Sequence, residues 1–271
     1  MQQIDSILAI ADQYDTIVFD QWGVLHNGTS PYPDAVLTID ALKDRSLAVL
    51  SNSGKRADVN ASRITGMGFA PDAFGVVMTS GEALHIEFSQ GRLREIKTLL
   101  PMTAAAGDAE KWAGSLPVSF TDTVDQADAV LLMGLPDADV HPAQSAILDQ
   151  ARARDLPLIC SNPDRASPRA HGKTVQSPGA LAHAYADAGG HVMFYGKPHK
   201  AIFDVLADAL QVTDPTRVLM VGDSPEHDIA GAQTVGWDSL FIAGGLHADT
   251  LADAFAGHPR HIHNSNTQVI Q

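Results

Sequence analysis

Four polar side chains lie at or near the ends of short apolar runs, where chemistry on a bound ligand is most easily placed. Asp20 ends "TIVFD" (16–20), Ser51 lies in "LAVLSNS" (47–53), Lys197 ends "HVMFYGK" (191–197) and Asp223 ends "RVLMVGD" (217–223). Such runs are typical of buried strands, and parallel sheets bind ligands just outside the carboxyl ends of their strands. One such residue alone would more simply begin a turn, but four together predict a ligand site at one edge of a sheet.

The aspartates of this set suit the transfer of a phosphoryl group. The carboxylate of Asp20 can attack phosphorus and form an aspartyl-phosphate, which splits one difficult displacement into two easier ones. Asp223 and Asp228, which both belong to the segment "GDSPEHD" (222–228), offer the oxygen ligands that Mg²⁺ prefers. We therefore expect a nucleophile and a Mg²⁺ site built from aspartates.

The remaining members of the set suit the binding of phosphate. The hydroxyl group of Ser51, together with the neighbouring Asn52, can donate hydrogen bonds to phosphoryl oxygens. The ammonium group of Lys197 can neutralise the negative charge that these oxygens carry during the transfer. These three residues are therefore predicted to bind the substrate.

Further strand-like and helix-like segments alternate along the chain and must position these residues. Strand-like runs occupy 75–80, 128–134, 156–160 and 239–245, and helix-like segments occupy 34–45, 57–66, 142–154, 199–210 and 226–235. An alternating order of strands and helices predicts an α/β fold, with a doubly wound, Rossmann-like parallel sheet covered by helices. The first strand is not followed by G-x-G-x-x-G, which argues against dinucleotide binding.

Composition narrows the class of partner. The 271 residues are 45% hydrophobic, and 18 Lys and Arg against 32 Asp and Glu give a net charge of -14. Such a charge repels nucleic-acid phosphates and anionic membranes, so a small molecule is the expected partner. The single Cys160 cannot form an internal disulfide, the N-terminal residues do not resemble a signal peptide, and no apolar run approaches the roughly 18 residues of a membrane span. We expect a cytoplasmic protein.

The order of these motifs resembles that of a known family. "FDQWGVL", "VLSNSGKR", "YGKPHKAIF" and "VGDSPEHDIAGAQTVGWDSLFI" look like the motifs of the haloacid dehalogenase (HAD) superfamily of Mg²⁺-dependent phosphohydrolases. The long insertion between the second and third motifs, with "CSNPDR" and "SPGALA", is similar to the subgroup with a large α/β cap, class IIA. The resemblance implies a core of residues 1–79 and 189–271 and a cap of 80–188, with a homodimer through the cap as a further expectation.

The resemblance also implies a role for each motif residue. Asp20 would be the nucleophile, Ser51 and Lys197 would bind the phosphate, and Asp223 would be a metal ligand. Asp228 would support the metal site indirectly, by holding its ligands or through water. The activity implied is the hydrolysis of a small phosphorylated metabolite.

One residue departs from the family pattern. Two positions after the nucleophile the family carries a second aspartate, whose backbone carbonyl binds the metal and whose side chain transfers protons. Here that residue is Trp22, which keeps the carbonyl but has an indole N–H that only donates a hydrogen bond. A positioned acid or base typically raises a reaction rate by about 10²–10⁴-fold. Because Trp22 provides neither, we expect a lower catalytic rate.

Several alternatives follow from Trp22. His26 or His199 could replace the missing acid, although a hydrogen-bonded histidine without such a role is the simpler interpretation. The substrate could instead carry a leaving group that needs no proton, such as an acyl or aryl phosphate. The competing class is a binding or regulatory protein that kept the phosphate and metal site but lost efficient turnover. The histidines of "HPRHIH" (258–263) are interpreted as a solvated tail.

Overall fold

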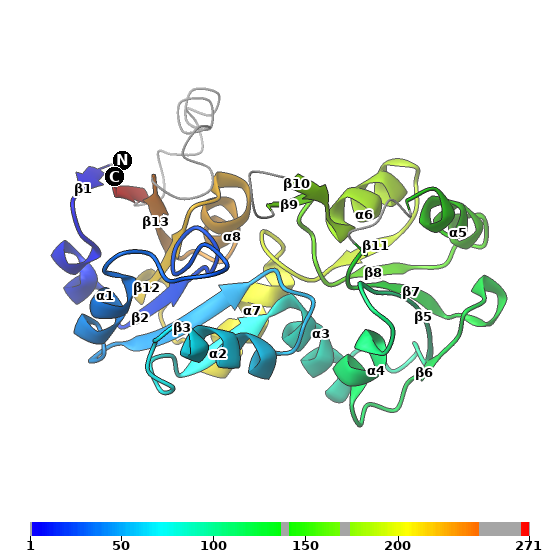
Figure 1. The fold of residues 1–271 in the computed structure, drawn as a ribbon, viewed down its shortest axis with the longest axis horizontal. Coiled ribbons are helices and arrows are strands. Elements are labelled where there is room, and N and C mark those ends of the chain that lie inside the picture. The colour runs from blue at the N-terminus through cyan, green and yellow to red at the C-terminus, as the bar shows by residue number, and fades with distance from the viewer. Residues whose placement is uncertain (1, 137–140, 169–173, 244–266, 271) are drawn as a thin grey trace. The chain divides into compact units, whose positions relative to one another are not determined.

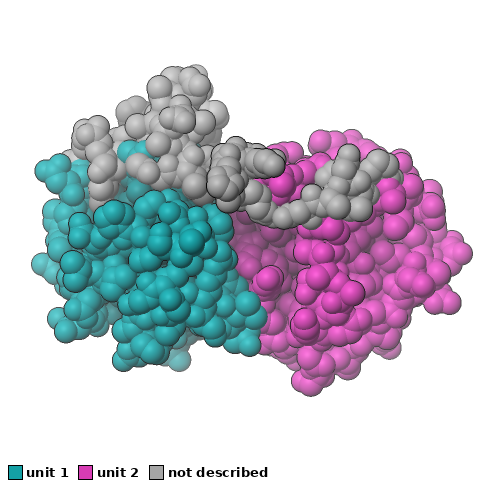
Figure 2. Space-filling model, viewed as in Figure 1, with its two compact units in different colours: residues 1–51, 57–78, 197–271 teal, residues 52–56, 79–196 magenta. Residues whose placement is uncertain are grey.

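The computed structural model describes residues 2–136, 141–168, 174–243 and 267–270 (Figure 1). The chain divides into two units, which Figure 2 shows in separate colours. The first unit comprises residues 1–51, 57–78 and 197–271, and the second comprises 52–56 and 79–196. The "HPRHIH" segment lies outside the described residues.

The first unit is built on a seven-stranded sheet. Its strand order is β1 (Gln2–Ile4), β14 (Thr267–Ile270), β13 (Asp238–Ile242), β12 (Val218–Gly222), β2 (Thr16–Phe19), β3 (Ser46–Ser51) and β4 (Val76–Thr79). The pairings from β1 through β3 are all parallel. The carboxyl ends of these strands therefore lie along one edge of the sheet.

Helices alternate with these strands in the sequence. They are α1 (Ala35–Ala41), α2 (Ala57–Gly66), α7 (Lys200–Leu210), a π-helix (Pro225–Ile229) and α8 (Ala230–Thr234). Ile39 of α1 and Ile64 of α2 pack in one cluster with Ile17 of β2. Val18 points to the opposite face because strand side chains alternate, and it is also fully buried. Both faces of the sheet are therefore covered, as in a doubly wound fold.

The second unit has a sheet of its own. Five parallel strands follow the order β11 (Val192–Phe194), β8 (Leu158–Cys160), β7 (Ala129–Leu132), β5 (Thr98–Met102) and β6 (Ser119–Phe120). Its helices are α3 (Ser80–Ser89), α4 (Asp108–Ala113), α5 (His141–Ala153) and α6 (Pro178–Asp187), and β9 (Ala166–Pro168) pairs antiparallel with β10 (Thr174–Gln176). No helix in the described ranges is long and apolar enough to span a bilayer.

The second unit is larger than the expected segment 80–188. Strand β11 belongs to it because Val192 and Phe194 pair with Leu158 and Cys160 of β8. The short segment 52–56 also belongs to it, because the guanidinium of Arg56 forms two hydrogen bonds with Glu82 of α3, at 2.6 and 3.1 Å. The chain thus passes between the units at 51/52, 56/57, 78/79 and 196/197.

We expect the core of the first unit to depend on Ile17 far more than on exposed apolar residues. Ile17→Ala should lower the free energy of unfolding by about 2–5 kcal/mol, because it leaves a cavity at a fully buried position. Leu37→Ala on α1 is the matched control, since Leu37 is 69% exposed and its loss should cost less than about 0.5 kcal/mol. Urea unfolding followed by circular dichroism measures both, and equal losses would contradict this account of the core.

Candidate active site

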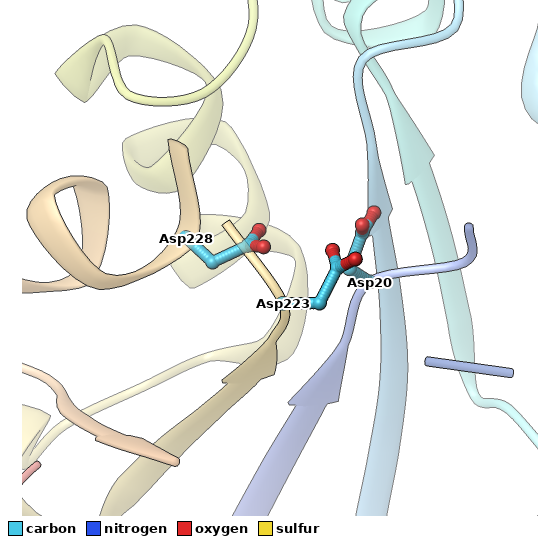
Figure 3. A group of neighbouring side chains, drawn as sticks. All are labelled: Asp20, Asp223 and Asp228. Atoms are coloured by element: carbon cyan, nitrogen blue, oxygen red, sulfur yellow. The ribbon is translucent and has the colours of Figure 1, made fainter. Parts of the chain in front are cut away.

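Two neighbouring strands deliver two aspartates to the same edge. Phe19 of β2 pairs with Val221 of β12, and the backbone N–H of Asp20 donates to the carbonyl of Val221 at 2.9 Å. Asp20 and Asp223 therefore leave adjacent strand ends almost in register, and Figure 3 shows their carboxylates side by side. The parallel register, set by buried apolar residues, is what brings these two side chains together.

Lys197 joins this pair to a third aspartate. Its ammonium lies 2.6 Å from Oδ1 of Asp20 and 2.7 Å from Oδ1 of Asp228, and its side chain is only 3% exposed. Asp228, on the π-helix after β12, is fixed in turn because its Oδ2 accepts the N–H of Ser224 at 3.0 Å. Burial alone would lower the pKa of Lys197, but the two carboxylates outweigh it and raise the pKa above its usual range. Lys197 is therefore a charged group held at a fixed position.

The three carboxylates suit a hard divalent cation. Oxygen atoms of Asp20, Asp223 and Asp228 lie within 4.8 Å of one another (Figure 3). Burial raises the pKa of Asp20 although Lys197 opposes the shift, and the charges of Asp228 and Asp223 raise it further. Three anionic groups facing one ammonium leave an excess of negative charge, which a cation would relieve. An all-oxygen donor set is what Mg²⁺ prefers, so the residues present fit this ion.

Two glycines that the sequence pattern did not single out make this arrangement possible. A Cβ atom on Gly222 would lie 2.1 Å from Cγ of Asp228, and one on Gly23 would lie 2.0 Å from Oδ2 of Asp223. Gly23 also has a φ of +85°, which side-chain-bearing residues rarely adopt. In the sequence, the only sign of these roles is position: Gly222 directly precedes Asp223, and Gly23 lies three residues after Asp20. The contacts that each glycine makes become visible only in the fold.

Ser51 and Asn52, the other residues predicted to bind the substrate, belong to different units. Ser51 is the last residue of β3, the strand beside β2, and it is buried. Asn52 belongs to the second unit, where its Nδ2 donates to Oδ1 of Asp164 at 2.7 Å. Asp20, Lys197, Asp223 and Asp228 thus form one cluster in the first unit, with Ser51 on an adjacent strand and Asn52 held in the other unit.

Two family models match the segments that carry this cluster. A model described as haloacid dehalogenase-like hydrolase matches residues 17–107, and one described as HAD-hydrolase-like matches residues 194–269. The chain belongs to the haloacid dehalogenase superfamily. This match confirms the expected superfamily. The Rossmann-like core described above agrees with it.

Named relatives of this HAD superfamily chain are phosphatases. It is 27% identical over 242 residues to the D-glycerol 3-phosphate phosphatase of Mycobacterium tuberculosis, covering 89% of this chain and 66% of that protein's length. The expected class of enzyme, a HAD-like phosphatase, is thereby confirmed.

Solved structures share the fold. A haloacid dehalogenase-like hydrolase from Brucella suis has a TM-score of 0.80 and 28% identity over 92% of this chain and 96% of that one. A glycerol phosphate phosphatase from Mycobacterium tuberculosis, solved in complex with magnesium, has a TM-score of 0.69 and 21% identity over 88% of this chain and 70% of that one. The second likeness is evidence for the fold alone.

In this HAD chain, Trp22 packs into its own loop. The Arg63 guanidinium of α2 lies 5.3 Å from the centre of its ring, and the ring of His26 meets it edge-on at 5.6 Å. A Cβ atom on Gly28 would lie 2.1 Å from the indole, so the loop passes very close to it. The Trp22 carbonyl accepts no hydrogen bond from any described residue, and it remains a candidate metal ligand.

His26 is not placed to act as the surrogate acid. It is fully buried, and its Nδ1 accepts the N–H of Gly28 at 3.0 Å. Its Nε2 is buried without a hydrogen-bond partner in the described part of the chain. Burial, aided by the charge of Arg63, lowers the pKa of His26 to about 4, so the ring is neutral at pH 7. His199 is the residue that precedes α7.

We expect Gly222→Ala to disturb the cluster without disrupting the core. The new methyl group would displace Asp228 and weaken its contact with Lys197, at a cost of about 1–3 kcal/mol of stability and most of any phosphatase activity. Gly66→Ala, at the end of α2, is the matched control, because a Cβ there meets nothing within 4 Å. Thermal unfolding and phosphatase assays compare the two, and equal effects would show that close packing at Gly222 is unimportant.

Proposed function

We propose that this protein is a Mg²⁺-dependent phosphohydrolase that acts on a small phosphorylated metabolite through a phosphoaspartyl intermediate on Asp20. The observation that carries the proposal is the contact of the Lys197 ammonium with Asp20, at 2.6 Å, and with Asp228, at 2.7 Å. It sets a buried cation beside a carboxylate that is still 15% exposed. A nucleophile next to a fixed positive charge is what attack on a phosphate dianion requires.

Each residue of the cluster has a distinct task in this proposal. The carboxylate of Asp20 attacks phosphorus, and Lys197 neutralises charge on the phosphoryl oxygens. Ser51, at the end of the next strand, donates its hydroxyl to one of these oxygens. Asp20 directly follows β2 and Ser51 ends β3, whereas Lys197 lies in the turn before α7 and not, as the sequence predicts, at a strand end of this sheet. The contacts of Lys197 with Asp20 and Asp228 fix its position instead.

The residues that would hold Mg²⁺ are Asp20, Asp223 and the carbonyl of Trp22, with Asp228 in support. Their all-oxygen character and excess negative charge favour this assignment. When bound, Mg²⁺ supplies positive charge that stabilises the phosphoryl oxygens in the transition state. A glycerol phosphate phosphatase with the same fold was itself solved in complex with magnesium.

A small substrate agrees with the charge of the protein and with its relatives. A net charge of -14 disfavours polyanions, and a relative is named for glycerol 3-phosphate. The second unit is the candidate for the cap of the class IIA subgroup, where substrate selection is expected. A homodimer through this unit is a further part of the proposal.

The competing function is a phosphate-binding or regulatory protein with little turnover. Trp22 favours it, since the proton-transferring aspartate is absent. Asp20 favours an enzyme, because a binding protein has no need of a nucleophile in contact with its phosphate-binding lysine. Phosphorylation of Asp20 would separate the two functions.

Asp20→Asn should abolish turnover, by about 10³-fold or more, while the protein stays folded. The amide has nearly the same shape and its oxygen can still accept from Lys197, but it is a poor nucleophile. The measurement is phosphate release from 4-nitrophenyl phosphate, with Asp125→Asn, an exposed residue of the second unit, as the control. Retained hydrolysis in the purified Asp20→Asn protein would exclude Asp20 as the nucleophile.

Asp223→Asn should weaken Mg²⁺ binding by at least about 10-fold, because it removes one anionic ligand from the cluster. Isothermal titration calorimetry of the metal-free protein with MgCl₂ measures this directly. Chelation with EDTA should abolish hydrolysis by the unmodified protein, and Mg²⁺ should restore it. Hydrolysis that persists in EDTA, or equal Mg²⁺ affinity of the two proteins, would contradict the metal site.

A further inference from the structure

The proposed reaction depends on whether a side chain can protonate the leaving oxygen. When Asp20 attacks phosphorus, the bond from phosphorus to the leaving oxygen breaks, and that oxygen takes the electron pair. An alkoxide is a poor leaving group and needs a proton from a positioned acid, whereas a carboxylate, enolate or phenolate departs as a stable anion. The side chains near Asp20 therefore limit which phosphates can react.

The position two residues after Asp20 provides no acid. The indole of Trp22 is held between Arg63, at 5.3 Å, and His26, at 5.6 Å, and the backbone at Gly28 packs against the ring. Arg63 is itself fixed, since its Nη2 donates to the carbonyl of Gly28 at 2.9 Å. The ring is thus held in place, and its N–H can donate a hydrogen bond but cannot transfer a proton near neutral pH.

The neighbouring histidine is closed off by geometry. The ring of His26 has no exposed surface, and its Nδ1 lone pair is occupied by the N–H of Gly28. A group that donates a proton must come within hydrogen-bond distance of the leaving oxygen, which a fully enclosed ring cannot do. His26 therefore has no route to the leaving oxygen in this structure, and the loop after Asp20 supplies no acid, which favours a leaving group that needs no proton.

We propose that the substrate of this site carries its phosphate on an acidic oxygen, that of a carboxyl, enol or phenol group. The proposal rests on the proposed function and narrows it to a class of phosphate. It sets this protein apart from a glycerol phosphate phosphatase, whose leaving group is an alcohol.

The reaction balances without an added acid. In the first step an Asp20 carboxylate oxygen bonds to phosphorus, and the leaving oxygen departs as an anion. In the second step water attacks phosphorus, the bond to Asp20 breaks, and Asp20 carboxylate and dihydrogen phosphate are released. Because neither Trp22 nor His26 can act as a base toward this water, we expect the second step to be slow and the phosphoaspartate to accumulate.

The test is the dependence of kcat/KM on the leaving group. The unmodified protein with Mg²⁺ is assayed with 4-nitrophenyl phosphate, phenyl phosphate, acetyl phosphate and glycerol 3-phosphate. We expect kcat/KM to fall as the leaving group becomes more basic, with glycerol 3-phosphate at least about 100-fold below 4-nitrophenyl phosphate. Rapid mixing with 4-nitrophenyl phosphate should give a burst of one nitrophenolate per active site, followed by slow turnover.

Trp22→Asp and Trp22→Asn form a matched pair. Both remove the indole and have nearly the same shape, but only the aspartate can transfer a proton. Trp22→Asp should raise kcat/KM for glycerol 3-phosphate at least about 10-fold above that of Trp22→Asn, with little difference between them for 4-nitrophenyl phosphate. Thermal unfolding and Mg²⁺ titration show whether both variants keep the fold and the metal site. If either variant fails to fold, the leaving-group series of the unmodified protein decides alone.

The outcomes separate this inference from the proposed function. Similar kcat/KM for alkyl and aryl phosphates in the unmodified protein would overturn the inference and leave the phosphatase intact. His199→Gln and Tyr32→Phe, the latter close enough to Asp223 to feel its charge, would then identify the donor. Failure of every phosphate to react, with no phosphorylation of Asp20 by acetyl phosphate, would overturn the proposed function itself.

Discussion

The buried contact of one ammonium with two carboxylates is the constraint on which the rest of the site depends. Lys197 lies within 2.7 Å of both Asp20 and Asp228 and is nearly inaccessible to water. Breaking a buried pair by removing one partner typically costs about 3–5 kcal/mol, because the remaining charge is left uncompensated. The contact therefore holds Asp20 after β2, Asp228 on the π-helix and Lys197 before α7 in one arrangement.

Close backbone packing is the second requirement of the same cluster. The carboxylates of Asp223 and Asp228 occupy the space that side chains on Gly23 and Gly222 would fill. The loop after Asp20 is also fixed by Trp22, whose ring packs against His26 and Arg63. The indole that replaces an aspartate thus has a structural role in the loop. Fixing the loop in this way is compatible with a metal-binding carbonyl but removes the proton donor, and this sets the chemistry of the leaving group.

The elements that the sequence predicted best are those with strong local patterns. Every apolar run assigned to a strand contains one, and the predicted helix 57–66 has the same bounds as α2. Strand β5 was not predicted, because Pro101 interrupts it and proline is unusual inside a sheet. It is tolerated there because β6 pairs only with Thr98 and Leu99, so the strand has no second neighbour at Pro101. In the sequence, segment 52–56 continues the motif that contains Ser51 and was assigned to the core. Its contacts assign it to the second unit instead.

By itself, the sequence determined which chemistry is available. The presence of a carboxylate, a hydroxyl and an ammonium group at or near the ends of apolar runs is set by residue type and apolar pattern, and these are local properties. The tertiary structure decided which of these groups act together. It joined Lys197 to Asp20 across 177 positions, kept Asn52 beside Asp164, and enclosed His26 completely. Such outcomes depend on contacts between residues far apart in the chain, and on the burial that those contacts create, which no local pattern encodes.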